Sequence, residues 1–247
     1  MIKQKQIRQF LLVSMVLAYI SFGIIVVSNA SFNEISSSPL HMFLLLLGFL
    51  SPFISSLLVY LLNKDELGGL PAFIDNFRVK LSSKGLLLVG LLLIAHYAFG
   101  IIFNNVESYG SVVDFFKYLP IMVILLGSQE IGWRKIQAYY EEKKGFIRSV
   151  IITGLFWAIW FLPLLFIRGF FVHPAFYTQF AGYLIGISFL LTSIYKVTNQ
   201  ISYSIILSSL IFALAPVILF KANYILLALA LLEAFVSVIL KNKKIYP

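Results

Sequence analysis

The segment Leu125–Ala138, LLGSQEIGWRKIQA, continues the apolar run that begins near Phe115. It places a carboxylate, Glu130, and a guanidinium, Arg134, four residues apart at a depth where the chain is expected to lie in or near lipid. Side chains at this spacing share one face of a helix, and charged groups within a membrane are costly. We therefore expect the other helices to form a bundle around this one.

The composition of the whole chain is that of an integral membrane protein. Of its 247 residues, 60% are hydrophobic and 12% are charged, whereas soluble domains carry roughly 25% charged residues. The mean hydropathy is +0.95. There is no cysteine, which excludes disulfides and thiolate metal sites. We predict an all-α polytopic membrane helix bundle in the lipid bilayer, with residues 1–247 forming one domain.

Apolar runs long enough to span a bilayer recur along the chain, and their number predicts about eight transmembrane helices. The expected spans are Phe10–Val27, Leu40–Leu62, Gly85–Phe103, Phe115–Trp133, Ser149–Ile167, Phe176–Tyr195, Tyr203–Phe220 and Tyr224–Leu240. The last two are separated by only three residues, so we expect a tight helical hairpin there, or one partly re-entrant span. The N-terminal run resembles a signal peptide but lacks a clear cleavage site, and we keep it as the first helix.

The distribution of positive charge indicates how the chain is oriented. The net charge is +9, and with the N-terminus inside, sixteen of the nineteen Lys and Arg residues fall in inside segments. Retention of positive loops on the cytoplasmic side explains this distribution without any nucleic-acid partner. We predict both termini in the cytoplasm and a location in the cell membrane.

Three further observations concern polar residues expected within the bundle. Glu130 and Arg134 form either a self-neutralising ion pair or part of a functional site. Glu233 lies in the middle of the last span with no Lys or Arg within one turn, so its partner must come from another helix or it must be protonated. His96 lies in the middle of the third span, and one histidine with one carboxylate is too little for a metal site.

Three segments carry a resemblance to a known family. QEIGWR at Gln129–Arg134, WAIWFLPLLF at Trp157–Phe166 and TNQISYSIILSSLIF at Thr198–Phe212 resemble, in order, the family's EEIGWR, WxxWHLP and HxxxN segments. The family is the CPBP family, also called Abi, of intramembrane metalloproteases, which includes the type II CAAX prenyl endopeptidases and bacteriocin-processing and immunity proteins. The resemblance implies a CPBP-like core over residues 119–220, a zinc cofactor in active members, and a bacterial plasma membrane as the location.

The chain departs from the family pattern where the chemistry should be. The first glutamate, which is thought to activate water, is Gln129, and the second-motif histidine is Phe161. In an ungapped reading, the third-motif histidine is Ser208 and the asparagine is Phe212. Glutamine is a very poor general base and phenylalanine cannot bind a metal, so losing these groups together should leave little activity. We expect no zinc and no confident catalytic residue.

These residues support a leading interpretation and two alternatives. The leading interpretation is a catalytically inactive relative, a pseudoprotease, that binds or regulates a partner membrane protein or peptide. Examples are a scaffold or regulator of an envelope protein, or a bacteriocin-immunity protein. The first alternative is an intramembrane metallo-endopeptidase with a rearranged site built from Glu130, Glu233 and His96. The second is a small transporter with Glu130 and Glu233 on its path.

Overall fold

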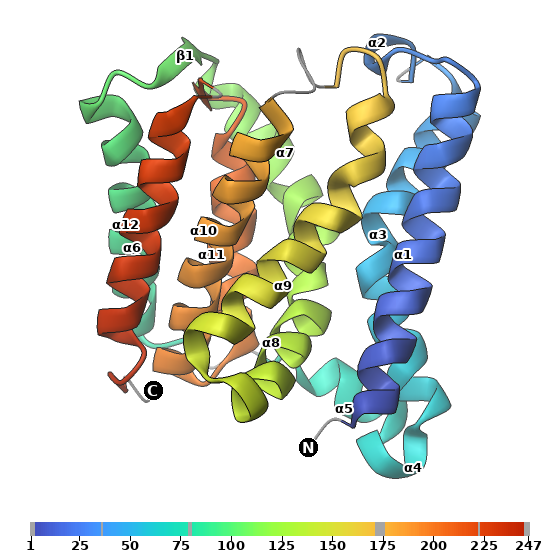
Figure 1. Cartoon of the computed structure of the whole chain (residues 1–247), viewed down its shortest axis with the longest axis vertical. Coiled ribbons are helices and arrows are strands. Elements are labelled where there is room, and N and C mark those ends of the chain that lie inside the picture. The colour runs from blue at the N-terminus through green and yellow to red at the C-terminus, as the bar shows by residue number, and fades with distance from the viewer. Residues whose placement is uncertain (1–2, 36, 79–80, 171–175, 222, 245–247) are drawn as a thin grey trace.

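The apolar runs fold into long helices that stand side by side (Figure 1). The computed structural model describes residues 3–35, 37–78, 81–170, 176–221 and 223–244. The long helices are α1 (Gln4–Val27), α3 (Pro39–Leu62), α6 (Ser83–Ile102), α7 (Val112–Leu125), α8 (Glu130–Lys144), α9 (Phe146–Phe161), α10 (Phe176–Thr198), α11 (Ile201–Leu214) and α12 (Tyr224–Leu240). The short elements are α2 (Phe32–Ile35), α4 (Lys64–Leu67), α5 (Gly69–Asp75), the 3₁₀ turns η1 (Gly127–Gln129) and η2 (Leu162–Phe166), and strands β1 (Val106–Tyr109) and β2 (Ile218–Phe220).

Length and composition confirm a helical, multi-pass membrane bundle. Within the described residues, six helical segments are long and apolar enough to cross a membrane, and one of them is the 33-residue segment Val112–Lys144, which contains α7, η1 and α8. Helices α11 and α12 are apolar but shorter, with 14 and 17 residues. Large apolar side chains also cover the outside of the bundle: Leu12 is 66% exposed, Ile94 66% and Leu231 73%. Such a surface suits lipid.

The prediction for the end of the seventh span was wrong. We expected a helix over Tyr203–Phe220, but α11 ends at Leu214 and residues Ile218–Phe220 form strand β2. Pro216 follows closely, and proline has no N–H to donate to the helical carbonyl four residues before it. No tight helical hairpin therefore joins α11 to α12.

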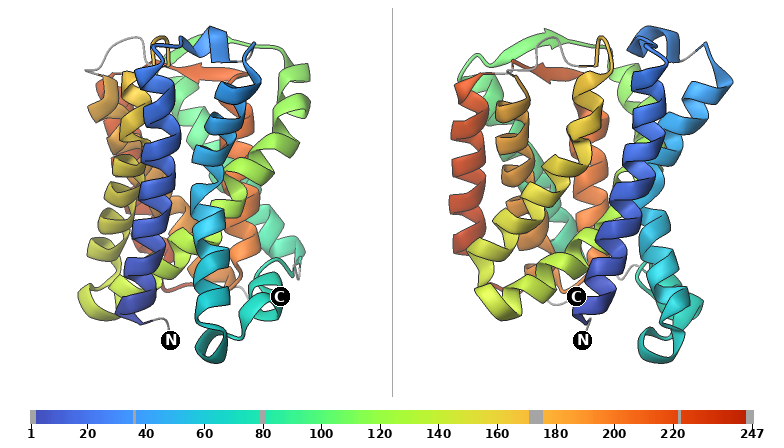
Figure 2. Two further views of the ribbon diagram at one scale, coloured as in Figure 1. Left: turned by 90° about the vertical axis from the view of Figure 1, so that its right-hand side faces the viewer. Right: turned by 45° about the vertical axis from the view of Figure 1, so that its right-hand side comes forward.

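Strand β2 pairs instead with β1, which belongs to the connection between α6 and α7. The pairing is antiparallel, with Val106 opposite Phe220 and Tyr109 opposite Ile218. It lies at the upper end of the bundle in Figure 2 and ties two distant connections together. This small sheet is the exception to the predicted all-α fold.

Helix α8 lies among the other helices, as its sequence predicts. The expected span Phe115–Trp133 is interrupted by the turn η1, so α8 starts inside the bundle at Glu130 and runs to its lower end (Figures 1 and 2). Ile131, Trp133 and Ile136 are fully buried. Helices α1, α3, α9, α10 and α11 all contact α8. The helix with the most polar sequence thus has its first turns enclosed by apolar ones.

A glycine allows α8 to approach α1 and α3 closely. A Cβ atom at Gly132 would lie 2.1 Å from Cε2 of Phe10 and 2.5 Å from Oγ of Ser56. The Phe10 ring cannot move away easily, because it is buried and packs edge-to-face on Trp133 at a centroid distance of 5.3 Å. Gly132 is therefore required by the packing around α8.

We predict that Gly132→Ala lowers the thermal unfolding temperature of the purified protein in detergent. Overpacking a rigid interior costs about 1–3 kcal/mol. The matched control is Gly90→Ala in α6, where a Cβ would meet nothing within 4 Å. There the better helix propensity of alanine, about 1 kcal/mol, should preserve or raise stability. Equal effects of the two substitutions would contradict the close approach at Gly132.

Candidate functional site

The first turn of α8 carries the predicted ion pair. Nε of Arg134 lies 2.9 Å from Oε2 of Glu130, and both side chains are at most 1% exposed. The spacing of four residues on one helix brings them together, as the sequence indicates. At this separation the charges attract strongly, yet neither Glu130 oxygen has an aligned hydrogen-bond donor. The carboxylate is thus held mainly by charge.

Arg134 also connects α8 to α10. Its Nη1 donates to the hydroxyl of Thr192 and, at 3.4 Å, to the carbonyl oxygen of Ser188. Nη2 of Arg134 and Oγ of Ser188 have no hydrogen-bond partner. The guanidinium therefore neutralises Glu130 on its own helix and fixes the neighbouring helix at the same time.

Gln129 uses both ends of its amide. Nε2 donates to the carbonyl oxygens of Phe49, at 2.7 Å, and Leu125, at 2.5 Å. Oε1 accepts from the indole N–H of Trp133 at 3.3 Å. An ionised glutamate offers no donor for the two carbonyls. The amide at this position thus has a structural role, linking η1 to α3.

Aromatic rings surround Phe161, the position matched to the second-motif histidine. Ring centroids of Trp160, Phe180, Phe49 and Trp157 lie 4.7, 5.4, 6.2 and 6.2 Å from that of Phe161. Phe161 itself is 3% exposed. Because protein interiors are close-packed, these rings occupy the space beside the position where the family places a ligand.

The third-motif positions lie close to the same aromatic rings. Phe212 of α11 packs edge-to-face on Trp157 at 5.9 Å. Ser208, one helical turn before Phe212, is fully buried, and its hydroxyl has no hydrogen-bond partner. The indole N–H of Trp157 also lacks a partner. The matched positions are therefore connected through two shared neighbours. Phe49 accepts a hydrogen bond from Gln129 and packs on Phe161, and Trp157 packs on both Phe161 and Phe212.

The residues at these positions do not fit a zinc ion. Zinc sites in proteins use nitrogen, thiolate or carboxylate ligands, with three protein ligands in catalytic sites. Four of the matched positions have no imidazole or carboxylate: Gln129, Phe161, Ser208 and Phe212. Glu130 is the remaining possible ligand among the matched positions, and it is paired with Arg134. The part of the chain that the structure describes contains no group of three His, Cys, Asp or Glu residues able to hold a metal.

A second polar cluster joins α6, α10 and α12. Nδ1 of His96 lies 2.5 Å from Oε1 of Glu233, and its Nε2 lies 2.9 Å from the hydroxyl of Tyr183. His96 is 1% exposed and Glu233 3%. Glu233 thus has a partner from another helix, which is one of the two possibilities that the sequence left open. Tyr183 was not predicted, because no sequence spacing relates it to either residue.

A glycine in α10 makes room for Glu233. A Cβ at Gly186 would lie 2.3 Å from Oε2 of Glu233 and 2.6 Å from Cα of Ala230. Oε2 is buried and has no hydrogen-bond partner. The carboxylate is thus pressed against the backbone of α10, with one oxygen engaged by His96 and the other bare.

The two clusters lie on different parts of α10. Thr192 contacts Arg134, whereas Tyr183, nine residues earlier, contacts His96. Nine residues correspond to about half a turn of rotation and about 13 Å along a helix. The structure therefore brings His96 and Glu233 together but keeps Glu130 in the other cluster, so these three residues do not form one rearranged site.

Comparison of the chain with models of known families and with curated proteins gives no match.

We predict that Arg134→Met is strongly destabilising and that adding Glu130→Leu restores most of the loss. Removing one partner of a buried ion pair costs about 3–5 kcal/mol, because the other charge is left unpaired, whereas apolar replacement of both is often close to neutral. Thermal unfolding of the single variants and the double variant in detergent measures this coupling. Additive losses in the double variant would show that the two side chains do not act as a pair.

Proposed function

We propose that this protein is a catalytically inactive, CPBP-like membrane protein that binds a partner membrane protein or peptide. The single observation that carries the proposal is the packing of the motif positions. Gln129, Phe161 and Phe212 come from η1, α9 and α11 and meet around Phe49 and Trp157. Three segments far apart in sequence thus lie close together in the bundle, as the segments of an active site would. Aromatic rings occupy the space between them.

The chemistry of these side chains supports binding rather than hydrolysis. Peptide hydrolysis by activated water needs a general base and electron-pair donors that hold the catalyst in place. Gln129 is committed to two carbonyl oxygens, and Glu130 to Arg134. No basic side chain therefore remains free at the matched positions.

A small apolar pocket marks the place where we propose that the partner contacts the bundle. It lies where α1, α3 and α8 meet. The lining residues are Ile7, Phe10, Ser56, Val59, Tyr60, Ile131, Gly132, Lys135 and Ile136. An apolar side chain of a membrane-embedded partner would pack over this pocket, beside the cationic group of Lys135. The partner classes that suit such a contact are an envelope protein that is scaffolded or regulated, and a membrane-active peptide such as a bacteriocin.

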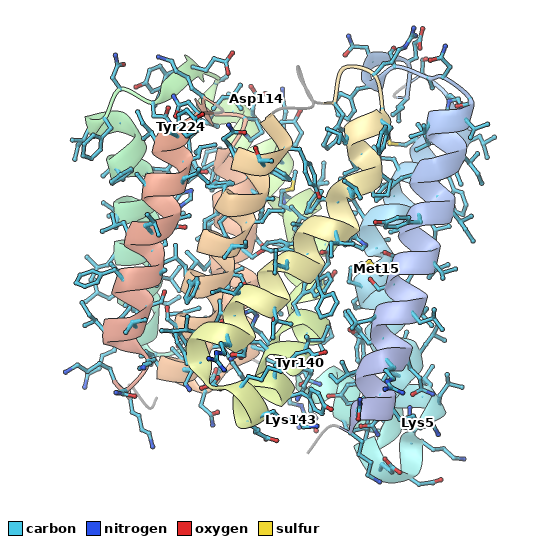
Figure 3. All side chains as sticks on the ribbon, in the orientation of Figure 1. Lys5, Met15, Asp114, Tyr140, Lys143 and Tyr224 are labelled. Carbon is cyan, nitrogen blue, oxygen red and sulfur yellow. The ribbon has the colours of Figure 1, made fainter. Side chains whose placement is uncertain are left out.

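We further propose eight spans, with both termini on the cytoplasmic side of a bacterial plasma membrane. The marked chain ends lie at the same end of the bundle in Figure 1. Lys5 and Lys143 lie at that end in Figure 3, and Asp114 and Tyr224 at the other. This distribution agrees with the retention of positive charge in the cytoplasm.

We predict that the tagged protein, purified in mild detergent from its native membranes, carries a stoichiometric membrane partner identifiable by mass spectrometry. Lys135→Glu should abolish its recovery, because the substitution places an anion beside the pocket. The matched control is Lys5→Glu, which makes the same charge change at an exposed position of α1 and should leave recovery intact.

Two results would contradict the proposal. One is that no partner is recovered with the protein from native membranes, or that a recovered partner is retained in Lys135→Glu. The other is metal-dependent peptide cleavage by the purified protein that disappears in Glu130→Ala.

A further inference from the structure

The cluster of His96, Glu233 and Tyr183 lies outside every segment that resembles the CPBP motifs. Three helices contribute one residue each, and the His96–Glu233 contact joins residues 137 positions apart. The two hydrogen bonds to His96 measure 2.5 and 2.9 Å. A connected polar group of this kind in a membrane interior is costly unless it has a role.

The charge of the cluster depends on a single proton. A neutral imidazole with an ionised Glu233 carries a net charge of −1, and one added proton makes the pair neutral, as imidazolium with carboxylate or imidazole with carboxylic acid. An isolated net charge is expensive to bury, so the two states differ in the cost of burying the cluster. Oε2 of Glu233 is buried and has no hydrogen-bond partner.

Aromatic side chains contact the His96 ring. From α6, Tyr97 packs edge-to-face on His96 at 4.8 Å and donates to the carbonyl oxygen of Ile211 in α11. From α10 comes Tyr183, and β2 contributes the apolar ring of Phe220, 5.6 Å from the imidazole. Tyr97, Tyr183 and Phe220 thus contact the imidazole from these elements, and none of the three is a cation.

On α12, polar residues extend from the cluster toward one end of the bundle. On α12, Glu233 is followed by Ser237 and Lys241 at intervals of four residues, which share a helix face and span about 12 Å. Oγ of Ser237 donates to Oγ of Ser193 in α10 at 3.4 Å, and Lys241 lies over the Phe146 ring at the lower end. In the other direction, α12 buries Leu229 and Leu226.

We propose that His96, Glu233 and Tyr183 form a buried site that binds and releases one proton, exchanged through the Ser193–Ser237 contact with the end of the bundle that carries both termini. This inference goes beyond the proposed binding function and does not depend on it. In both states one hydrogen lies in the short contact between Nδ1 and Oε1, and the added proton is bound at Nε2, beside the hydroxyl of Tyr183. In the deprotonated state Nδ1–H donates to Glu233, and Tyr183 donates to Nε2. When the imidazole becomes positively charged, Nε2–H donates to the Tyr183 oxygen, so the direction of that hydrogen bond reverses.

Infrared difference spectroscopy of the full-length protein in phosphatidylcholine vesicles, recorded over a range of pH, tests this proposal. We expect a carboxylic-acid or imidazolium signal that changes in a one-proton transition. Glu233→Gln, which preserves the shape of the side chain, should abolish the transition. The double variant Glu130→Leu with Arg134→Met, which removes the other buried carboxylate together with its partner, should retain it. Ser237→Val should slow hydrogen–deuterium exchange of the signal several-fold.

A second measurement does not require Glu233→Gln to fold. The three histidines are His41, His96 and His173, so replacing His41 and His173 with glutamine leaves His96 alone for ¹⁵N magnetic resonance. We expect its ring nitrogens to shift over the same pH range as the infrared transition. The proposal is overturned by constant His96 and carboxyl signals wherever the protein stays folded. It is equally overturned by a transition that persists in Glu233→Gln or disappears in the folded double variant Glu130→Leu, Arg134→Met.

Discussion

The burial of the first turns of α8 is the constraint on which the rest of the structure depends. This helix begins inside the bundle with a carboxylate and a guanidinium that are both inaccessible to water. Such charges are tolerable only because they lie one turn apart and because Thr192 and Ser188 of α10 accept from Arg134. The surrounding helices must therefore pack closely and in one arrangement around α8.

Helix α10 separates two kinds of polar chemistry. One part of it completes the charged group that holds α8, and another part carries Tyr183, which joins α6 and α12 through His96 and Glu233. The first group is a pair of opposite charges on neighbouring turns of α8. The second is proposed to gain and lose a proton. The same bundle thus has a buried ion pair in one place and, in another, a His96–Glu233 contact whose protonation can change.

The sequence predicts interactions within one helix better than interactions between helices. The pairing of Glu130 with Arg134 follows from a spacing of four residues. That Glu233 needs a partner from another helix is also predictable, but its identity as His96 depends on how three helices pack. The end of α11 was missed because apolar composition outweighed the signal of Pro216. The strand pairing beyond it needs two connections that the sequence does not relate.

The most direct test of the account is whether the motif positions meet within the membrane. The chain has no cysteine, so pairs of introduced cysteines can be cross-linked without background. Cysteines replacing Phe49 and Phe161, whose ring centroids are 6.2 Å apart, should cross-link efficiently with a short thiol-specific reagent in intact membranes. Cysteines replacing Phe49 and the lipid-exposed Phe235 should not. Cross-linking of the second pair, or failure of the first, would contradict the arrangement of α3 and α9 on which the proposed site rests.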